Sequence, residues 1–207
     1  MVKLGRPIVM SAEDRRKEIF QIAEKLFGEQ GFENTTMSQI AVAAGMSKKT
    51  LYVIFSDKRE LLKSLVSSSY ILQTDPIETK YADPLEHVKD VLNSIAAHVL
   101  SDRHIKLCRL AIAERLAIEG ITDTFYEMGI ATSRNYLVRS LESLNLAQFK
   151  LKLDHETMAD LLFGATIAKP FIDLLFIDKQ VDLKEIQLKI EQVLESCFDK
   201  DVAENLV

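Results

Sequence analysis

The chain has 207 residues, of which 47% are hydrophobic and 28% are charged, and its formal net charge is −5. This composition supports a folded core and excludes a disordered chain, and the lack of a run of about 20 apolar residues excludes an ordinary membrane span. The first residues lack the apolar segment of a signal peptide, and two cysteines, Cys108 and Cys197, do not suggest a disulfide framework. We therefore expect a cytoplasmic protein with no membrane partner.

The charge is distributed unevenly along the chain. Residues 1–63 contain 11 Lys and Arg against 8 Asp and Glu, whereas residues 64–207 contain 15 against 23. A mildly basic N-terminal region is compatible with contact to DNA, because the attraction to phosphates is short-ranged under physiological screening. Many unrelated proteins have a similar asymmetry, so the motifs decide the function.

The N-terminal region predicts a succession of short, well-capped helices. Ser11 is a good N-cap for the first helix, and Gly31 is its expected C-cap because glycine tolerates the left-handed conformation there. Thr36 and Gln39 have the spacing of a capping box, which begins a second helix that ends at Gly45.

The rest of the chain is also predicted to be helical. Ser47 caps a short third helix that reaches about Phe55, and Asp57 begins a fourth. Helical periodicity then predicts helices at residues 58–73, 85–101, 103–119, 122–145, 155–177 and 182–200. The expected fold is all-α, with an N-terminal arm and three-helix domain at residues 1–57 and a larger helical domain at residues 58–207.

Residues 36–55 have the pattern of a helix-turn-helix, in which two short helices are joined by a tight turn containing glycine. Ala41 and Ala44 are small enough to let the two helices approach closely, and Gly45 permits the reversal of the backbone. The second of these helices carries polar residues and is too short to be stable alone. Such a helix, held rigidly by its neighbours, can enter a major groove.

A family resemblance rests on the residues Gly31-Phe32, Thr35-Thr36, Ile40-Ala41, Ala44-Gly45-Met46-Ser47, Thr50-Leu51-Tyr52, Phe55 and Asp57-Lys58. This pattern resembles the signature of the TetR family of repressors and covers about residues 11–63. The C-terminal part is similar to that family only in length and helical character. The resemblance implies a homodimer that binds a double-stranded DNA operator and a small-molecule effector. It implies no cofactor.

The resemblance implies DNA contacts at seven positions, namely Thr36, Ser47, Lys48, Lys49, Thr50, Tyr52 and Lys58. Thr36, Tyr52 and Lys58 would contact backbone phosphates, and residues 47–50 would face base edges or phosphates. Ile54 departs from the family, which often has Tyr or His there, so one phosphate contact is missing. The Lys48-Lys49 pair is more basic than usual, which we expect to strengthen backbone attraction or to read guanine.

Several of these assignments have alternatives. Tyr52 could pack at a domain junction, and Lys58 could be a solvated cation paired with an acid. Which of Lys48 and Lys49 reads bases is open. The segment Lys3–Pro7 could be an arm that reaches the minor groove or an inert tail.

For the C-terminal part, the resemblance implies a ligand pocket and a dimer interface formed by the last two helices. The candidate pocket residues are His98, Cys108, Arg109 and Tyr126. A mostly apolar cavity with a few polar groups suits a hydrophobic or amphiphilic effector. The candidate interface residues are Leu161, Gly164, Ala168, Ile190 and Leu194, and the alternative for each of them is the core of a single protomer.

The sequence thus predicts a ligand-responsive transcriptional regulator, a repressor that its effector releases from a palindromic operator. One alternative is a helical adaptor that has lost DNA binding, which the departure at Ile54 favours. Another is a helical enzyme, but the chain has no GxxxxGK, GxGxxG, HExxH, GxSxG or CxxC motif. The run Asp154-His155-Glu156 fits a helix N-terminus, so no metal site is expected.

Overall fold

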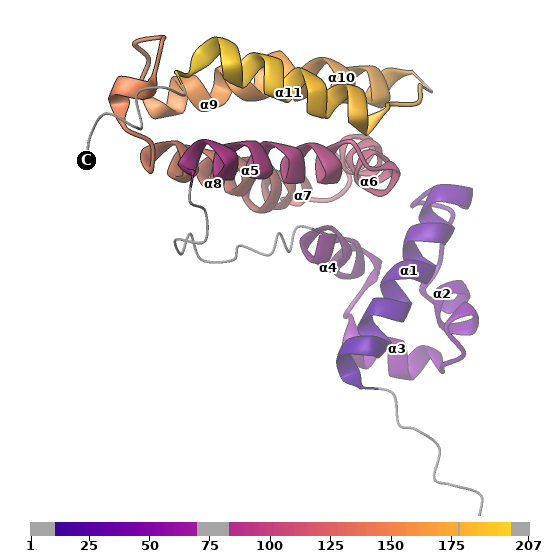
Figure 1. Cartoon of the computed structure of the whole chain (residues 1–207). Helices are drawn as coiled ribbons and strands as arrows, with labels where there is room; N and C mark the ends of the chain where they lie inside the picture. Colours follow the sequence, from indigo (N-terminus) through magenta and orange to yellow (C-terminus); the bar gives the residue numbers. More distant parts are fainter. Residues whose placement is uncertain (1–10, 70–82, 178, 200–207) are drawn as a thin grey trace, which may run out of the picture.

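The computed structural model describes residues 11–69, 83–177 and 179–199, and the segment Lys3–Pro7 lies outside them. Within these residues the chain forms helices and no β-strand. Its fold is an N-terminal helix-turn-helix domain followed by a larger helical domain. In Figure 1 the first four helices form a head, and the remaining helices form a body of two layers.

The head consists of α1 (Ala12–Gln30), α2 (Met37–Ala43), α3 (Lys48–Ile54) and α4 (Lys58–Ser69). The helix α1 begins where the Ser11 hydroxyl accepts a hydrogen bond from the Asp14 amide at 3.0 Å. It ends at Gly31, whose φ of +81° lies in the left-handed region and whose amide donates to the Phe27 carbonyl at 3.0 Å. Both predicted caps of this helix are confirmed.

The head has a core of its own that continues into the body. Leu51 and Phe55 of the helix-turn-helix are fully buried, and Leu61 and Leu65 of α4 pack into the same cluster. This cluster also includes Leu107, which lies on a helix of the body. The predicted division after residue 57 therefore does not coincide with a break in the packing.

The body contains α5 (Pro84–Val99), α6 (Asp102–Ala113), α7 (Ile121–Phe125), η1 (Tyr126–Ala131), α8 (Thr132–Glu142), η2 (Leu146–Gln148), α9 (His155–Phe163), η3 (Gly164–Ala168), α10 (Lys169–Phe176) and α11 (Leu183–Cys197). Figure 1 shows one layer made by α5 to α8 and the other by α9 to α11. The core lies between the layers, where α11 packs on α5 and α9 packs on α8.

Two of the long predicted helices contain a wider, π-helical turn. The segment η1 joins α7 to α8, and η3 joins α9 to α10, so each pair continues as one helical run. In the second run Pro170 is the second residue after η3. Proline has no amide hydrogen to donate to the preceding turn, and a local change of helical pitch accommodates it.

The helix predicted at residues 103–119 ends earlier, at Ala113. Its last predicted residues form turns instead, and this places Ile118, which is 1% exposed, in the core shared with the head. Tertiary packing thus overrides the local helical preference of this segment. No helix among the described residues is long and apolar enough to cross a membrane.

Candidate nucleic-acid interface

The turn between α2 and α3 is fixed by its backbone. Gly45 has a φ of +60°, a conformation that side-chain-bearing residues rarely adopt. The Gly45 amide donates to the Val42 carbonyl at 3.1 Å, and the Met46 amide donates to the Ala41 carbonyl at 3.0 Å. Ala41 and Ala44 are buried, as their small size predicted. The predicted helix-turn-helix geometry is therefore present.

The helix α3 is only seven residues long, and its environment holds it in place. The Ser47 hydroxyl accepts a hydrogen bond from the Thr50 amide at 3.1 Å, which caps its N-terminus as predicted. Leu51 anchors its inner face, and Phe55 at its C-terminal end is fully buried. A helix of this length is not stable in isolation, so its rigidity comes from these contacts.

The outer face of α3 presents polar side chains to solvent. Lys48, Lys49 and Thr50 are exposed, and Tyr52 is 42% exposed. The Lys48 ammonium lies 5.7 Å from the centroid of the Tyr52 ring, a cation–π arrangement. The exposure of Tyr52 does not fit the alternative in which it packs at a domain junction.

Thr36 and Gln39 form the predicted capping box at the start of α2. The Gln39 amide donates to Thr36 Oγ1 at 3.2 Å, and the Thr36 amide donates to Gln39 Oε1 at 2.7 Å. The Thr36 hydroxyl also lies 2.9 Å from Gln39 Oε1. The capping box satisfies two of the amides at this helix N-terminus, and a phosphate contact by the Thr36 hydroxyl stays a prediction.

Lys58, at the start of α4, has a structural role that the sequence did not predict. Its ammonium donates to the carbonyl of Phe32 and, at 3.2 Å, to that of Glu33, both in the loop between α1 and α2. It also lies 4.2 Å from the centroid of the Phe32 ring. The alternative pairing with an acid is not among these contacts, and a phosphate contact by Lys58 stays a prediction. Lys58 ties α4 to the loop that sets the position of Thr36.

Sequence reasoning also missed Arg16 of α1. Its guanidinium lies 4.7 Å from the ring centroid of Phe55 and 5.7 Å from that of Phe20. These two rings are themselves 5.7 Å apart. Arg16 therefore covers the end of the head core beneath α3, a long-range contact for which the sequence carries no local signal.

Comparison with known proteins assigns this head to a family. The family model described as bacterial regulatory proteins of the tetR family matches residues 19–65. The regulator AcrR of Shigella flexneri is 27% identical over 108 residues, which are 50% of this chain and 50% of that protein. The DNA-binding head, over residues 19–65, is thus that of the TetR family.

Other relatives extend the similarity into the body of the chain. A helix-turn-helix transcriptional regulator of Staphylococcus aureus strain USA300 is 24% identical over 157 residues, covering 70% of this chain and 85% of that protein. The solved structure of the flavonoid-responsive regulator FrrA is 25% identical, with a TM-score of 0.70, and covers 91% of this chain and 100% of that one. These relatives indicate a transcriptional regulator and not an enzyme. Regulators of this family bind DNA and small-molecule effectors, commonly as dimers.

The four predicted pocket residues do not share one environment. Cys108 is buried, and burial raises the pKa of its thiol to about 12. His98 is half-buried, whereas Tyr126 is 55% exposed. Arg109 donates to the carbonyls of Leu174 at 2.7 Å and Leu175 at 3.1 Å, so it holds the C-terminal end of α10 against α6.

Sequence reasoning missed His104, whose ring lies next to that of His98, one of these candidates. The centroid of the His104 ring lies 4.9 Å from the ring centroid of His98, 5.6 Å from that of Phe125 and 6.1 Å from that of Phe171. Burial, and secondarily the charge of His98, lowers its pKa to about 4. His104 and Cys108 lie one helical turn apart on the inner face of α6.

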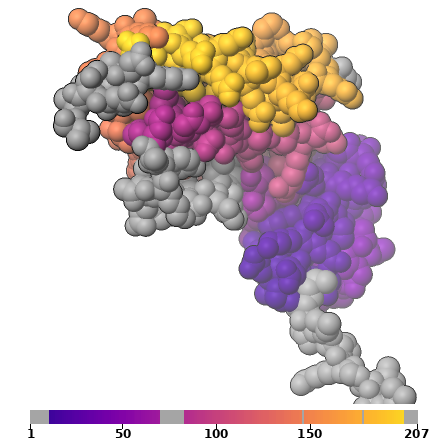
Figure 2. Space-filling model, viewed as in Figure 1, coloured from indigo at the N-terminus to yellow at the C-terminus, as the bar shows by residue number. Residues whose placement is uncertain are grey.

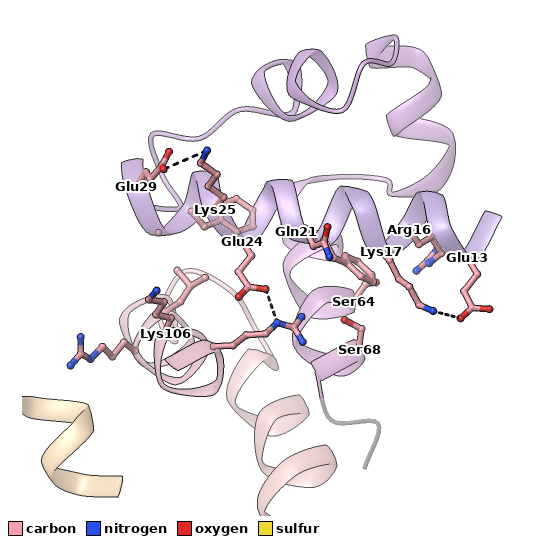
Figure 3. A pocket seen from close by; sticks show the side chains of 16 residues that line it. Glu13, Arg16, Lys17, Gln21, Glu24, Lys25, Glu29, Ser64, Ser68 and Lys106 are labelled. Carbon is pink, nitrogen blue, oxygen red and sulfur yellow. Dashed lines mark hydrogen bonds and ion pairs between the residues drawn. The ribbon is translucent and has the colours of Figure 1, made fainter. Parts of the chain in front are cut away.

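An open cleft lies between α1, α4 and α6. Figure 2 shows the head in contact with the body in this part of the molecule. The volume of the cleft is about 1290 Å³, and of the four predicted pocket residues only Arg109 lines it. Figure 3 shows ion pairs along its wall, including Lys17 with Glu13. Glu24 of the same wall pairs with Arg103 of α6. A cleft lined mostly by charged and polar residues does not match the predicted pocket, which has few polar groups.

The structure separates the predicted interface residues into two groups. Ile190 and Leu194 of α11 are 0% and 3% exposed and belong to the core of the protomer, so the intramolecular alternative holds for them. Leu161 and Gly164 are exposed, and Ala168 is half-buried. Together with Ala165, Ile172 and Phe176 they lie along the run from α9 to α10.

The run Asp154-His155-Glu156 forms a helix N-terminus, as the sequence predicted. The Asp154 carboxylate accepts a hydrogen bond from the Thr157 amide at 2.7 Å, and this bond lowers the pKa of the carboxyl group. No group of three or more potential metal ligands occurs among the described residues.

Proposed function

We propose that this chain is a dimeric transcriptional repressor that binds a palindromic DNA operator through α3 and is released by a small-molecule effector. The observation that carries the proposal is the outer face of α3. A helix too short to fold alone is held by Leu51, Phe55 and the capping Ser47, and it presents lysines, a threonine and a tyrosine outward. Rigid presentation of donors is what base and phosphate recognition in a major groove requires.

The DNA-contacting residues have different roles in this proposal. Lys48, Lys49 and Thr50 face base edges or phosphates, with Ser47 at the helix N-terminus near a phosphate. Tyr52 donates from its phenol to a phosphate, and Thr36 contacts the backbone at the start of α2. Lys58 acts as a positioning residue, because two loop carbonyls already accept from its ammonium.

In this proposal a second copy of the chain packs against an apolar stripe on the layer formed by α9 to α11. We define the α9–α10 stripe as Leu161, Ala165, Ala168, Ile172 and Phe176. These residues follow one another at intervals of three or four positions, so they lie on one side of the helical run. Phe176 is 83% exposed and Ile172 is 53% exposed. An exposed row of large apolar side chains marks an association surface, and the small alanines allow close approach.

The effector site in this proposal lies in the body beside α6, near His98 and Cys108. The helix α6 carries His104 and Cys108 on its inner face and Arg103 on its outer face, where Arg103 pairs with Glu24 of α1. A ligand that displaces α6 would therefore move the head. The ligand acts only by its preference for one conformation, and release follows when the two α3 helices no longer match successive major grooves about 34–36 Å apart. FrrA, named as flavonoid-responsive, supports a response to small molecules in this fold.

The experiment that tests this function is selection of binding sites from a random pool of double-stranded DNA by the purified protein. A footprint of the enriched sequence at two salt concentrations follows. We expect a protected palindrome that is lost with Lys48→Ala or Tyr52→Ala and kept with Lys189→Ala, which removes an exposed lysine of α11 far from α3. Only weak, salt-sensitive binding without an enriched sequence would overturn the proposal and favour a protein adaptor.

A further inference from the structure

Two valines of the helix-turn-helix stand out because they are as exposed as lysines. Val42 of α2 is 80% exposed and Val53 of α3 is 81% exposed. Exposing an apolar side chain to water is unfavourable, and valine is among the residues most often buried. Val42 lies on the helix that supports the turn, whereas Val53 lies on the helix that faces DNA in the proposed function. Only Val53 therefore has a position from which it would meet a base edge.

The direction of the Val53 side chain follows from that of Leu51, the one residue of α3 that is fully buried. Leu51 points into the head core. Lys49 precedes Leu51 by two positions and Val53 follows it by two, so each lies about 160° around the helix from Leu51. Lys49 and Val53 are four positions apart and therefore neighbours on the helix surface. The outermost ridge of α3 is thus one cation next to one apolar side chain.

The chemistry of the major groove offers a partner for that apolar side chain. Base edges there present hydrogen-bond donors and acceptors, and the one apolar group among them is the 5-methyl of thymine. Valine has no donor or acceptor in its side chain, so it cannot pair with the polar edges of guanine, cytosine or adenine. Packed against those base edges, the valine side chain would leave their polar atoms with neither water nor another hydrogen-bond partner, which is unfavourable.

We infer that Val53 is a specificity residue that contacts the 5-methyl group of a thymine in each half of the operator. The inference rests on the proposed function, in which α3 enters the major groove. Lys49, its neighbour on the ridge, supplies attraction to the DNA, and Val53 supplies the preference for thymine at one position. The resemblance to the TetR family does not assign this role, because it rests on other residues of α3 and not on Val53.

The test replaces each thymine of the selected operator, one symmetric pair at a time, by deoxyuridine. Deoxyuridine forms the same base pair and lacks only the methyl group. Wild-type protein, Val53→Ala and the matched control Val42→Ala are each titrated with the full set of operators at one fixed salt concentration. Helicity of each variant is compared with the wild type by circular dichroism, so that a folding defect is recognised.

At one symmetric pair of positions, we expect deoxyuridine to weaken binding by the wild type and by Val42→Ala. The expected loss of affinity is about fourfold per half-site, which corresponds to the free energy of removing one methyl group from water. Val53→Ala should bind the thymine and deoxyuridine operators within twofold of each other. The inference is overturned if no substituted thymine weakens binding by the wild type, or if Val53→Ala keeps the same loss. Failure of the proposed function looks different, because then no operator is selected at all.

Discussion

Arg103 on α6 and Glu24 on α1 form an ion pair that connects the body to the head, with Arg103 Nε 2.9 Å from Glu24 Oε2. The two residues are 79 positions apart in sequence, and their side chains are 48% and 20% exposed. The pair lies at the wall of the cleft between α1, α4 and α6 (Figure 3). It is therefore placed to set the orientation of α3 relative to the helix that carries His104 and Cys108.

Breaking this pair should affect DNA binding more than folding. Because both side chains are partly exposed, we expect Glu24→Gln to change the free energy of unfolding by less than about 1 kcal/mol. Operator affinity should fall roughly two- to fivefold, since a loosely held head samples more orientations. Lys25→Gln is the control, because Lys25 pairs with Glu29 within α1 at 4.0 Å. Equal operator affinity of Glu24→Gln and wild type would show that the pair does not position the head.

Lys58 should be required for the stability of the head. Lys58→Met removes two hydrogen bonds to the carbonyls of Phe32 and Glu33 and the contact with the Phe32 ring. We expect a loss of about 2 kcal/mol in the free energy of unfolding, measured by urea denaturation. Arg59→Met, at the exposed neighbouring position, should leave stability nearly unchanged. If Lys58 acted only on a phosphate, Lys58→Met would be as stable as the wild type.

The salt dependence of operator binding separates the roles of Lys48 and Lys49. Each phosphate contact that is lost should reduce the slope of log K against log salt by about 0.9. A dimer loses two such contacts, so the alanine variant of a phosphate-binding lysine should have a slope smaller by about 1.8. A lysine that reads a base should instead change the preferred sequence at one position of each half-site. Two alanine variants that leave both the slope and the sequence preference unchanged would remove both residues from the interface.

The α9–α10 stripe should hold two protomers together. We expect Ile172→Glu or Phe176→Glu to convert a dimer into a monomer at micromolar concentration, measured by light scattering, with helicity retained. Both side chains are exposed in the single chain, so a charge there does not disturb the protomer core. Val42→Glu is a control of similar exposure in the head. A dimer that survives both stripe substitutions would place the interface elsewhere.

The buried residues of α11 should respond differently. Ile190→Ala leaves a cavity in the protomer core, and we expect it to lower the free energy of unfolding by about 2–4 kcal/mol. Amphipathic periodicity alone could not separate this residue from Leu161. The pattern of an apolar helix face is the same whether its own chain or a second chain covers it.

Local signals explain which features the sequence predicted well. Capping requires a hydroxyl and an amide two or three residues apart, so Ser47 and the Thr36–Gln39 box could be placed from the sequence with their helix ends. The contacts of Lys58, Arg16 and Arg109 join segments that are far apart in the chain, and no local pattern specifies them. The shortened helix α6 has the same cause, because burial of Ile118 against the head outweighs helix propensity.

His104 should make the protein less stable at mildly acidic pH. Its ring lies among His98, Phe125 and Phe171, and burial lowers its pKa to about 4 from the ordinary value of about 6.5. The folded protein keeps this ring neutral, whereas the unfolded chain takes up a proton below about pH 6.5. Stability from this residue is therefore complete above that pH and is lost as the pH falls toward 4.

Between pH 7 and pH 5 this difference in protonation amounts to roughly 2 kcal/mol in the free energy of unfolding. We expect urea denaturation of the wild type to show this loss and His104→Leu to show a clearly smaller one. A part of the pH dependence should remain, because burial and then the charge of Arg103 also lower the pKa of His98. If wild type and His104→Leu lost the same stability over this range, protonation of His104 would not be linked to unfolding.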